Sequence, residues 1–185
     1  MQLLIEKGYD RFSLQDVGQQ AKCSYELVNF YFGNKDGLLN ALAKYIIGNL
    51  SSELQSLDEA PNGFDKFAQK IRYVATVADR DSTTFTAYLR IASEAPFQQP
   101  LTQLCRARRS ETVDIFRDSI IAGKASGDIR RNVDANEIAH VSYDFVRGHV
   151  DRRLLDRDNK STTKFGSIIE TFIELLRTQI AVRKR

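Results

Sequence analysis

Residues 8–39 hold three helix-start signals at short intervals, and this spacing limits the fold more than any other feature of the chain. Ser13 stands at an N-cap position with an acidic residue three places later, which is typical of a capping box. Ser24 offers a second cap and Asn34 a third. The turn between the first two helices has room for about three or four residues, a spacing that sets two helices at a steep angle. The pattern predicts a helix-turn-helix over about residues 14–33.

Apolar residues in this stretch recur at helical spacing. In the first helix they follow at i, i+3 and i+7, which gives one apolar stripe. The residues expected to face inward are Leu14, Val17 and Ala21 in the first helix and Leu27, Val28 and Phe32 in the second.

At these residues the chain resembles the DNA-binding domain of TetR-type bacterial transcription regulators. That family's run is roughly Gly-Tyr-x-x-Thr/Ser-x-x-x-Ile/Val-Ala, then Ala-Gly-Val-Ser, then Tyr-x-x-Phe-x-x-Lys-Asp/Glu-x-Leu. The matching residues are Gly8, Tyr9, Ser13, Val17, Ala21, Ser24, Phe32, Lys35, Asp36 and Leu38. The departures are Gly18 for Ala, Lys22 for Gly, Glu26 for a small residue and Asn29 for Tyr. The core and cap residues match the family pattern, whereas the residues of the expected DNA-reading face differ from it. This combination is typical of a regulator that recognises its own operator.

The remainder of the chain has a helical pattern. Apolar residues recur at spacings of three and four from about residue 35, and again from Phe64 onward, without sustained strand alternation. A proline and an Asn-Gly pair mark a linker at residues 58–63. We therefore expect an all-α fold, with a helix-turn-helix domain over residues 1–50 and a second helical domain over residues 51–185.

Several functional classes are excluded by the residues that the chain lacks. No run approaches the roughly 18–20 apolar residues of a membrane span, and the N-terminus has no signal-peptide pattern, so we expect a cytoplasmic protein. There is no Gly-rich phosphate loop, His-Glu-x-x-His run, Cys-x-x-Cys pair or Gly-x-Ser-x-Gly elbow. His140 and His149 lie on nearly opposite sides of one predicted helix, which does not suit a metal site. We expect neither an enzyme nor a cofactor.

The charge distribution complicates the DNA-binding interpretation. The net charge is +3, yet residues 1–50 carry five basic and five acidic groups, so 5 − 5 = 0. Phosphate attraction is the sequence-independent part of DNA affinity, and this region supplies little of it. The first helix has only residues 2–7 ahead of Gly8, whereas the family usually has a longer helix with a basic arm. This suggests a late start or a truncated chain.

The resemblance implies that the second helix of the motif enters the major groove. Asn pairs bidentately with adenine, Glu accepts from cytosine N4, and aromatic rings contact thymine methyl groups. By position, Ser24, Tyr31 and Lys35 fall where the family contacts phosphate. The complete expected DNA-binding set is Ser13, Ser24, Tyr25, Glu26, Asn29, Phe30, Tyr31 and Lys35. The alternatives are a core position for Phe30, a purely capping role for Ser24, and rejection of phosphate by Glu26.

The resemblance also implies an effector pocket and a dimer interface in the second domain. The effector-binding candidates are Phe64, Ile71, Phe85, Tyr88, Leu89, Phe116, Ile120 and Phe145, for each of which an ordinary core position is the alternative. The last two helices carry broad apolar stripes, and in this family they pair with their mates into a four-helix interface. The interface candidates are Val141, Phe145, Gly148, Phe165, Ile169, Phe172, Ile173 and Leu176.

Two hypotheses follow from the sequence. The first is a homodimeric, ligand-responsive transcriptional repressor that binds operator DNA and an unknown small molecule. The second is an all-α ligand-binding or interaction module of the same architecture whose DNA binding is weak or lost. The neutral first domain, the short first helix and Glu26 favour the second hypothesis.

Overall fold

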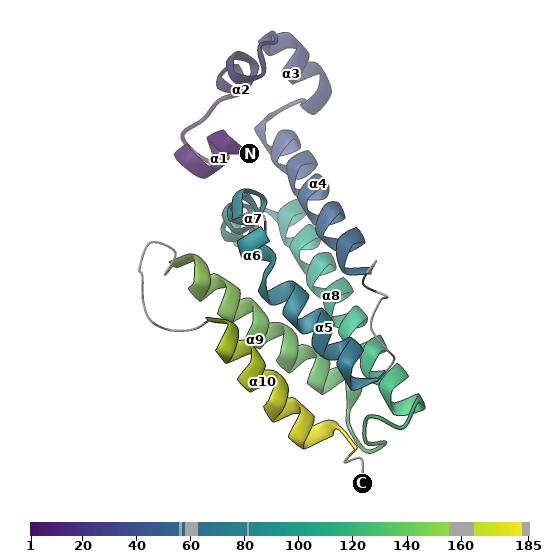
Figure 1. Cartoon of the computed structure of the whole chain (residues 1–185). Coiled ribbons are helices and arrows are strands. Elements are labelled where there is room, and N and C mark those ends of the chain that lie inside the picture. The colour runs from purple at the N-terminus through teal and green to yellow at the C-terminus, as the bar shows by residue number, and fades with distance from the viewer. Residues whose placement is uncertain (56, 58–62, 81, 156–164, 183–185) are drawn as a thin grey trace. The chain divides into compact units, whose positions relative to one another are not determined.

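The computed structural model describes residues 1–55, 57, 63–80, 82–155 and 165–182, and they form an all-α protein (Figure 1). The N-terminal helices are α1 (Gln2–Lys7), α2 (Leu14–Ala21), α3 (Tyr25–Phe32) and α4 (Lys35–Gln55). The middle of the chain forms α5 (Phe64–Ala75), α6 (Val77–Arg80), α7 (Ser82–Glu94) and a 3₁₀ turn, η1 (Ala95–Phe97). The C-terminal helices are α8 (Gln99–Ala125), α9 (Ala135–Leu155) and α10 (Phe165–Ile180). None of the described helices is long and apolar enough to cross a membrane.

The chain forms two compact units, and α4 and α8 each begin in the first unit and end in the second. The first unit comprises Met1–Leu50 and Asp81–Arg108, and the second comprises Ser51–Arg80 and Arg109–Arg185. The first unit thus includes α7, which we had expected in the second domain. Compactness alone does not assign function, so the functional division at residue 50 stays a prediction.

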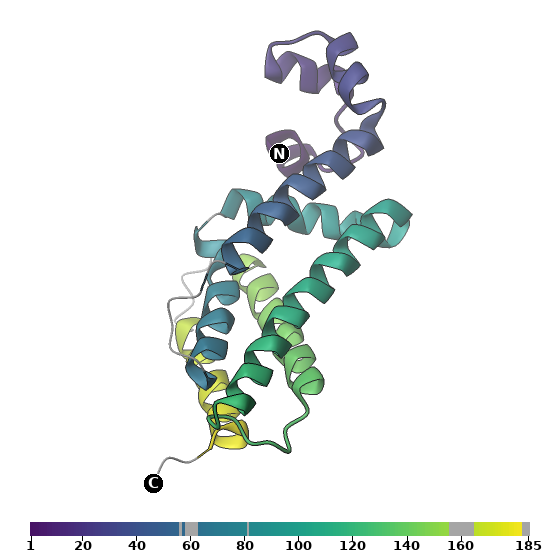
Figure 2. The same cartoon turned by 90° about the vertical axis from the view of Figure 1, so that its right-hand side faces the viewer.

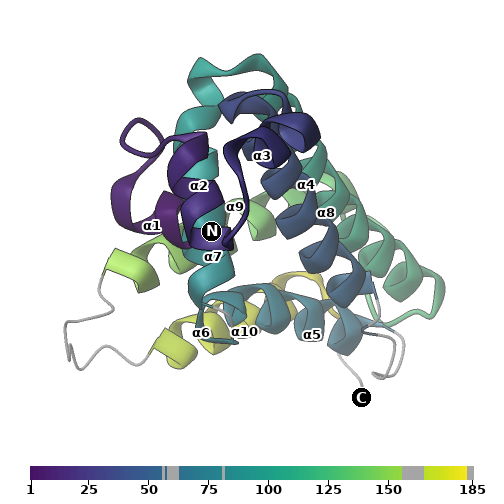
Figure 3. The ribbon, with the colours of Figure 1, turned by 90° about the horizontal axis from the view of Figure 1, so that it is seen from above.

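In the first unit, α2 packs on α3 and α1 lies against α7 (Figure 3). The apolar side chains of this unit are removed from water, which is the main source of its stability. Its most deeply buried members are Leu4, Leu39, Ala43, Ile46, Ala87, Ile91 and Leu101. The core of the first unit therefore includes residues that are distant in the sequence from the helix-turn-helix.

In the second unit, α5, α9 and α10 lie side by side (Figures 1 and 2). The ring of Phe67 on α5 meets Phe64 edge-on at 6.2 Å and Phe116 on α8 at 5.8 Å, an arrangement that aromatic pairs prefer. Phe67, Phe116, Ile71, Ile120 and Ile173 have no exposed surface. These helices are held together by an apolar core.

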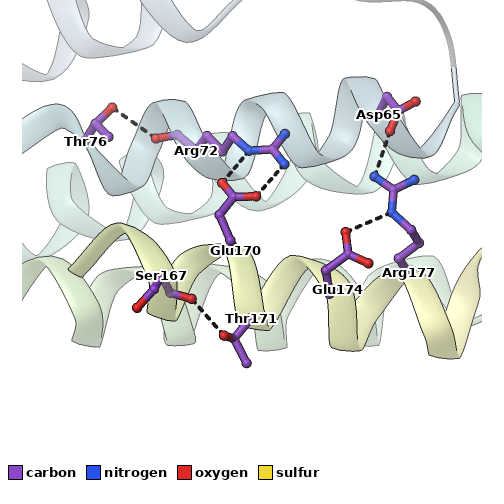
Figure 4. Close-up of polar contacts among 8 residues, drawn as sticks. All are labelled: Asp65, Arg72, Thr76, Ser167, Glu170, Thr171, Glu174 and Arg177. Atoms are coloured by element: carbon purple, nitrogen blue, oxygen red, sulfur yellow. Dashed lines mark hydrogen bonds and ion pairs between the residues drawn. The ribbon is translucent and has the colours of Figure 1, made fainter. Parts of the chain in front are cut away.

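Ion pairs join α5 to α10 at the surface of the second unit (Figure 4). Arg72 donates two hydrogen bonds of 2.7 Å to the carboxylate of Glu170. Arg177 donates to Asp65 at 2.9 Å, and its guanidinium lies 4.5 Å from the ring centroid of Phe64. The two pairs bridge α5 and α10, and exposed pairs of this kind each contribute only about 0–1 kcal/mol.

The helix boundaries largely confirm the sequence predictions. The helical segment that begins at Phe64 is interrupted at Thr76, whose backbone N–H donates to the carbonyl oxygens of Arg72 and Val74. The linker predicted at residues 58–63 lies outside the described residues, except for Gly63, which has φ +102° and precedes α5. Asp134 caps α9 by accepting from the backbone N–H groups of Asn136 and Glu137.

Candidate nucleic-acid interface

The first helix of the motif begins at the predicted capping box. The Ser13 hydroxyl accepts from the backbone N–H of Asp16 at 3.1 Å, and the Asp16 carboxylate accepts from the backbone N–H of Ser13 at 2.6 Å. Hydrogen bonds from the Ser13 N–H and hydroxyl, with Lys7 nearby, lower the pKa of Asp16 to about 2. Ser13 therefore has a structural role, and its contact with DNA stays a prediction.

A tight turn joins α2 to α3. Lys22, the residue after α2, has left-handed backbone angles (φ 54°, ψ 41°), which non-glycine residues seldom adopt. The N–H of Cys23 donates to the carbonyl of Gly18 at 2.9 Å. A Cβ atom on Gly18 would lie 2.9 Å from the carbonyl oxygen of Cys23, so glycine allows this close approach. The two departures from the family pattern, Gly18 and Lys22, thus lie at the same turn.

The second helix of the motif packs on one side only. Ser24 caps α3 by accepting from the backbone N–H of Leu27 at 3.2 Å. Val28 is buried and Phe32 is half-buried, as predicted. Leu27 is 46 % exposed, so its assignment to the inward face was wrong. Ala21, the last residue of α2, is exposed as well, so its assignment to the inward face was also wrong.

The residues expected to read base pairs lie on the exposed sides of α3. Tyr25, Glu26, Asn29, Phe30 and Tyr31 are all exposed. Phe30 is 80 % exposed, which removes the alternative of a core position. Its ring meets that of Tyr31 edge-on, with centroids 5.4 Å apart. The helix thus presents two aromatic rings to a partner.

Glu26 is held at the start of α3. Its own backbone N–H and the Ser24 hydroxyl hydrogen-bond to the carboxylate and lower its pKa. The group is therefore negatively charged at neutral pH. The carboxylate can accept a hydrogen bond from the amino group of a base, and its negative charge repels phosphate.

Lys35 begins α4 beside two aromatic rings. Its ammonium nitrogen lies 4.6 Å from the ring centroids of both Tyr9 and Phe12, within the range of a cation–π interaction. The Tyr9 hydroxyl donates to the Asp36 carboxylate. Burial and the nearby Asp36 raise the pKa of Tyr9 to about 12. These contacts hold the cation at the N-terminus of a helix, where free N–H groups favour an anion.

The sequence of this region matches a known protein family. Residues 1–42 match the model of a family described as bacterial regulatory proteins, tetR family. The N-terminal region is thus similar to the tetR family. The matched residues include α2 and α3, the two helices of the helix-turn-helix. No curated protein sequence matches the chain.

Solved structures of transcription regulators share the fold of nearly the whole chain. A TetR transcription regulator from Haloarcula marismortui is 17% identical with a TM-score of 0.83, covering 98% of this chain and 93% of its own. A putative TetR-family regulator from Rhodococcus sp. is 19% identical with a TM-score of 0.80, covering 95% and 93%. A putative transcriptional regulator from Saccharomonospora viridis, solved with choline, is 17% identical with a TM-score of 0.76, covering 98% and 93%.

The structure divides the effector-binding candidates between the two units. Phe85, Tyr88 and Leu89 belong to the first unit, and the other five belong to the second. Six of the eight are buried, and the exceptions, Leu89 and Phe145, are half-buried. A surface groove of ≈ 490 Å³ lies along α10, and none of the eight lines it. Their role in effector binding stays a prediction.

The dimer candidates fall into two groups. Ile169, Ile173 and Leu176 are buried within their own chain. In contrast, Val141 and Gly148 are exposed, while Phe145 and Phe172 are half-buried. The side chain of Phe165 lies outside the described residues. The second group, rather than the first, leaves surface open to another chain.

The two histidines lie on different sides of α9. His140 is exposed and His149 is buried. Burial, followed by the positive charge of Arg152, lowers the pKa of His149. Among the described residues, no group of three or more His, Cys, Asp or Glu side chains has an arrangement that would hold a metal ion.

Proposed function

We propose that this chain is a ligand-responsive transcriptional regulator, most simply a repressor, which binds operator DNA in the cytoplasm as a homodimer. The match of residues 1–42 to the tetR family model carries the proposal. The exposed residues of α3 support it, since this helix has a packed side and a free side with hydrogen-bonding and aromatic groups. In a helix-turn-helix the second helix enters the major groove.

We assign the base contacts to the flank of α3 that carries Tyr25 and Asn29. Both side chains are exposed, and they lie four residues apart, on one side of the helix. The amide of Asn29 offers a donor and an acceptor that match the N6 and N7 atoms of adenine. Ser24 and Lys35, at the starts of α3 and α4, would contact the phosphates on either side.

A homodimer accounts for the apolar surface on α9 and α10. Val141, Phe145 and Gly148 follow at spacings of four and three, and so share one side of α9. Phe172 and Leu175 share one side of α10, and Phe172 stacks on Phe145. We call these five residues the α9–α10 face. Two such faces would pack as a four-helix interface and present two reading helices about one turn of DNA apart.

Effector control would act through the same dimer. The choline complex of the Saccharomonospora viridis protein shows that a regulator of this fold binds a small organic molecule. An effector could bind more tightly to a dimer in which the spacing of the two α3 helices does not match the DNA half-sites. Such an effector would lower the affinity for the operator, because ligand and DNA would then favour different conformations. The protein itself would carry out no enzymatic reaction.

Binding to DNA from the region upstream of its own gene tests this function. The full chain is titrated into labelled upstream DNA with random DNA as competitor. We expect specific binding, which Asn29→Ala weakens by about 1–3 kcal/mol per half-site. Asn136→Ala, at an exposed position of α9, is the matched control and leaves affinity unchanged. Equal affinity for upstream and random DNA would instead favour the ligand-binding module without DNA binding, which the neutral charge of residues 1–50 supports.

A further inference from the structure

Large apolar side chains gather on the exposed surface of α3, unlike the polar groups that most DNA contacts need. Phe30 is 80 % exposed, and Tyr31 and Leu27 beside it are exposed as well. Large apolar side chains that gather on one exposed surface mark a binding site more often than single ones do. This patch is distinct from the Tyr25–Asn29 flank, and hydrogen bonding does not explain it.

Helix geometry directs Phe30 away from the core. Val28 is buried, and two residues correspond to about 200° around a helix, so Phe30 lies almost opposite Val28. Glu26, four residues earlier, shares this outward side. The outward side therefore carries one carboxylate and one phenyl ring, which is braced edge-on by Tyr31.

The major groove offers few groups that a phenyl ring contacts favourably. The base edges there present hydrogen-bond donors and acceptors, and covering these without a partner costs free energy. The exception is the C5-methyl group of thymine, which is apolar and projects into the groove. A ring on the outward side of a reading helix is thus complementary to thymine and not to the edges of the other bases.

We propose that Phe30 is a specificity-determining residue that reads thymine through its C5-methyl group. This inference rests on the proposed DNA-binding function and names one feature of the operator: a thymine in each half-site, under the outward side of α3. The neutral charge of residues 1–50 raises the share of affinity that such base contacts supply, because the electrostatic attraction to phosphate is small. Lys7, for example, pairs with Asp16 at 3.2 Å.

Thymine-to-uracil replacement in DNA tests the inference, because deoxyuridine lacks only the methyl group. The probe is the duplex that the full chain enriches most strongly from a random-sequence library. Each thymine is replaced by deoxyuridine in turn, and affinity is measured for the wild type, Phe30→Ala and Phe97→Ala. Phe97 on η1 is 84 % exposed, so its substitution is a matched control for the loss of an exposed ring.

We expect one thymine per half-site at which deoxyuridine weakens wild-type binding about fourfold, the effect of one buried methyl group. Phe30→Ala should bind the thymine duplex more weakly and should no longer distinguish it from the deoxyuridine duplex. Phe97→Ala should behave as the wild type.

Three results would overturn the inference, and they distinguish its failure from that of the proposed function. Wild-type binding that is specific but insensitive to every deoxyuridine would show that Phe30 does not read a methyl group, with the proposed function intact. The same holds if Phe30→Ala keeps the full discrimination. Failure of the library to enrich any sequence would overturn the proposed function itself, and the inference with it.

Discussion

The rings of Phe145 on α9 and Phe172 on α10 stack with centroids 3.9 Å apart and an interplanar angle of 12°. The stack joins the two helices within the second unit and is part of the α9–α10 face. Both rings remain half-buried in the single chain. Their remaining apolar surface would be removed from water by a second copy of the chain, which would contribute to dimer stability.

Leu175→Glu should convert the dimer to monomers. Leu175 is 60 % exposed and follows Phe172 by three residues, so the new carboxylate would enter the interface without a partner. We expect the dissociation constant of the dimer to rise by about two orders of magnitude. Analytical ultracentrifugation measures this directly. Ile121→Glu on α8, where the native side chain is 51 % exposed, is the control. Equal dimerisation of both variants would place the interface elsewhere.

Lys35→Ala should weaken binding to all DNA sequences alike. Its ammonium is held at the N-terminus of α4, and a protein that neutralises one phosphate fewer has a slope of log affinity against log salt that is shallower by about 0.9. Titrations at several salt concentrations, with specific and random DNA, give this slope. Lys44→Ala, an exposed lysine further along α4, should leave it unchanged. An unaltered slope for Lys35→Ala would mean that this lysine serves only to pack against Tyr9 and Phe12.

Lys22→Gly should stabilise the protein by about 1 kcal/mol. Lys22 has a φ of 54°, a conformation that costs an ordinary residue roughly 1–2 kcal/mol and glycine very little. The greater freedom of glycine in the unfolded chain offsets part of that gain. Urea unfolding measures the difference. Gln19→Gly, inside α2, is the control and should destabilise by about 1 kcal/mol. If both variants lose stability equally, the backbone of Lys22 is not left-handed.

The capping box should make the free energy of unfolding depend on pH in the acidic range. The folded state lowers the pKa of Asp16 from 3.8 to about 2, so the ionised carboxylate stabilises the fold. This contribution is complete above pH 3.8 and is lost as the pH falls through 2. Asp16→Asn should therefore be less stable at neutral pH and should lose less stability between pH 4 and pH 2.

Urea unfolding of the wild type, Asp16→Asn and Asp10→Asn between pH 4 and pH 2 tests this prediction. Asp10 is an exposed carboxylate of the same unit, and its replacement should keep the acid sensitivity of the wild type. Identical acid sensitivity in the wild type and Asp16→Asn would contradict the assignment.

Local signals made the motif predictable from sequence, whereas the surfaces were harder to predict. Caps such as Ser13 and Ser24 act on backbone N–H groups three residues away, so their residues and spacing suffice to place a helix start. Leu27 was misplaced because α3 is short and α2 packs against only a narrow side of it. This narrow buried side admits Val28 and leaves the neighbouring Leu27 outside.

Long-range packing explains the remaining differences. The periodicity of α10 shows that one side is buried, yet it does not distinguish burial within the chain, as for Ile173, from burial against a second chain. Likewise, no local signal indicated that α7 would group with the N-terminal helices. The position of Lys35 between Tyr9 and Phe12 also depends on a contact across more than twenty residues.

The most direct test of the central claim is the stoichiometry and specificity of DNA binding. The full chain is titrated into duplex from its own upstream region and into random duplex, each at two salt concentrations. We predict saturation at two chains per site, tighter binding to the upstream duplex, and affinity that falls as salt rises. Weak and equal binding to both duplexes at both salt concentrations would contradict this prediction.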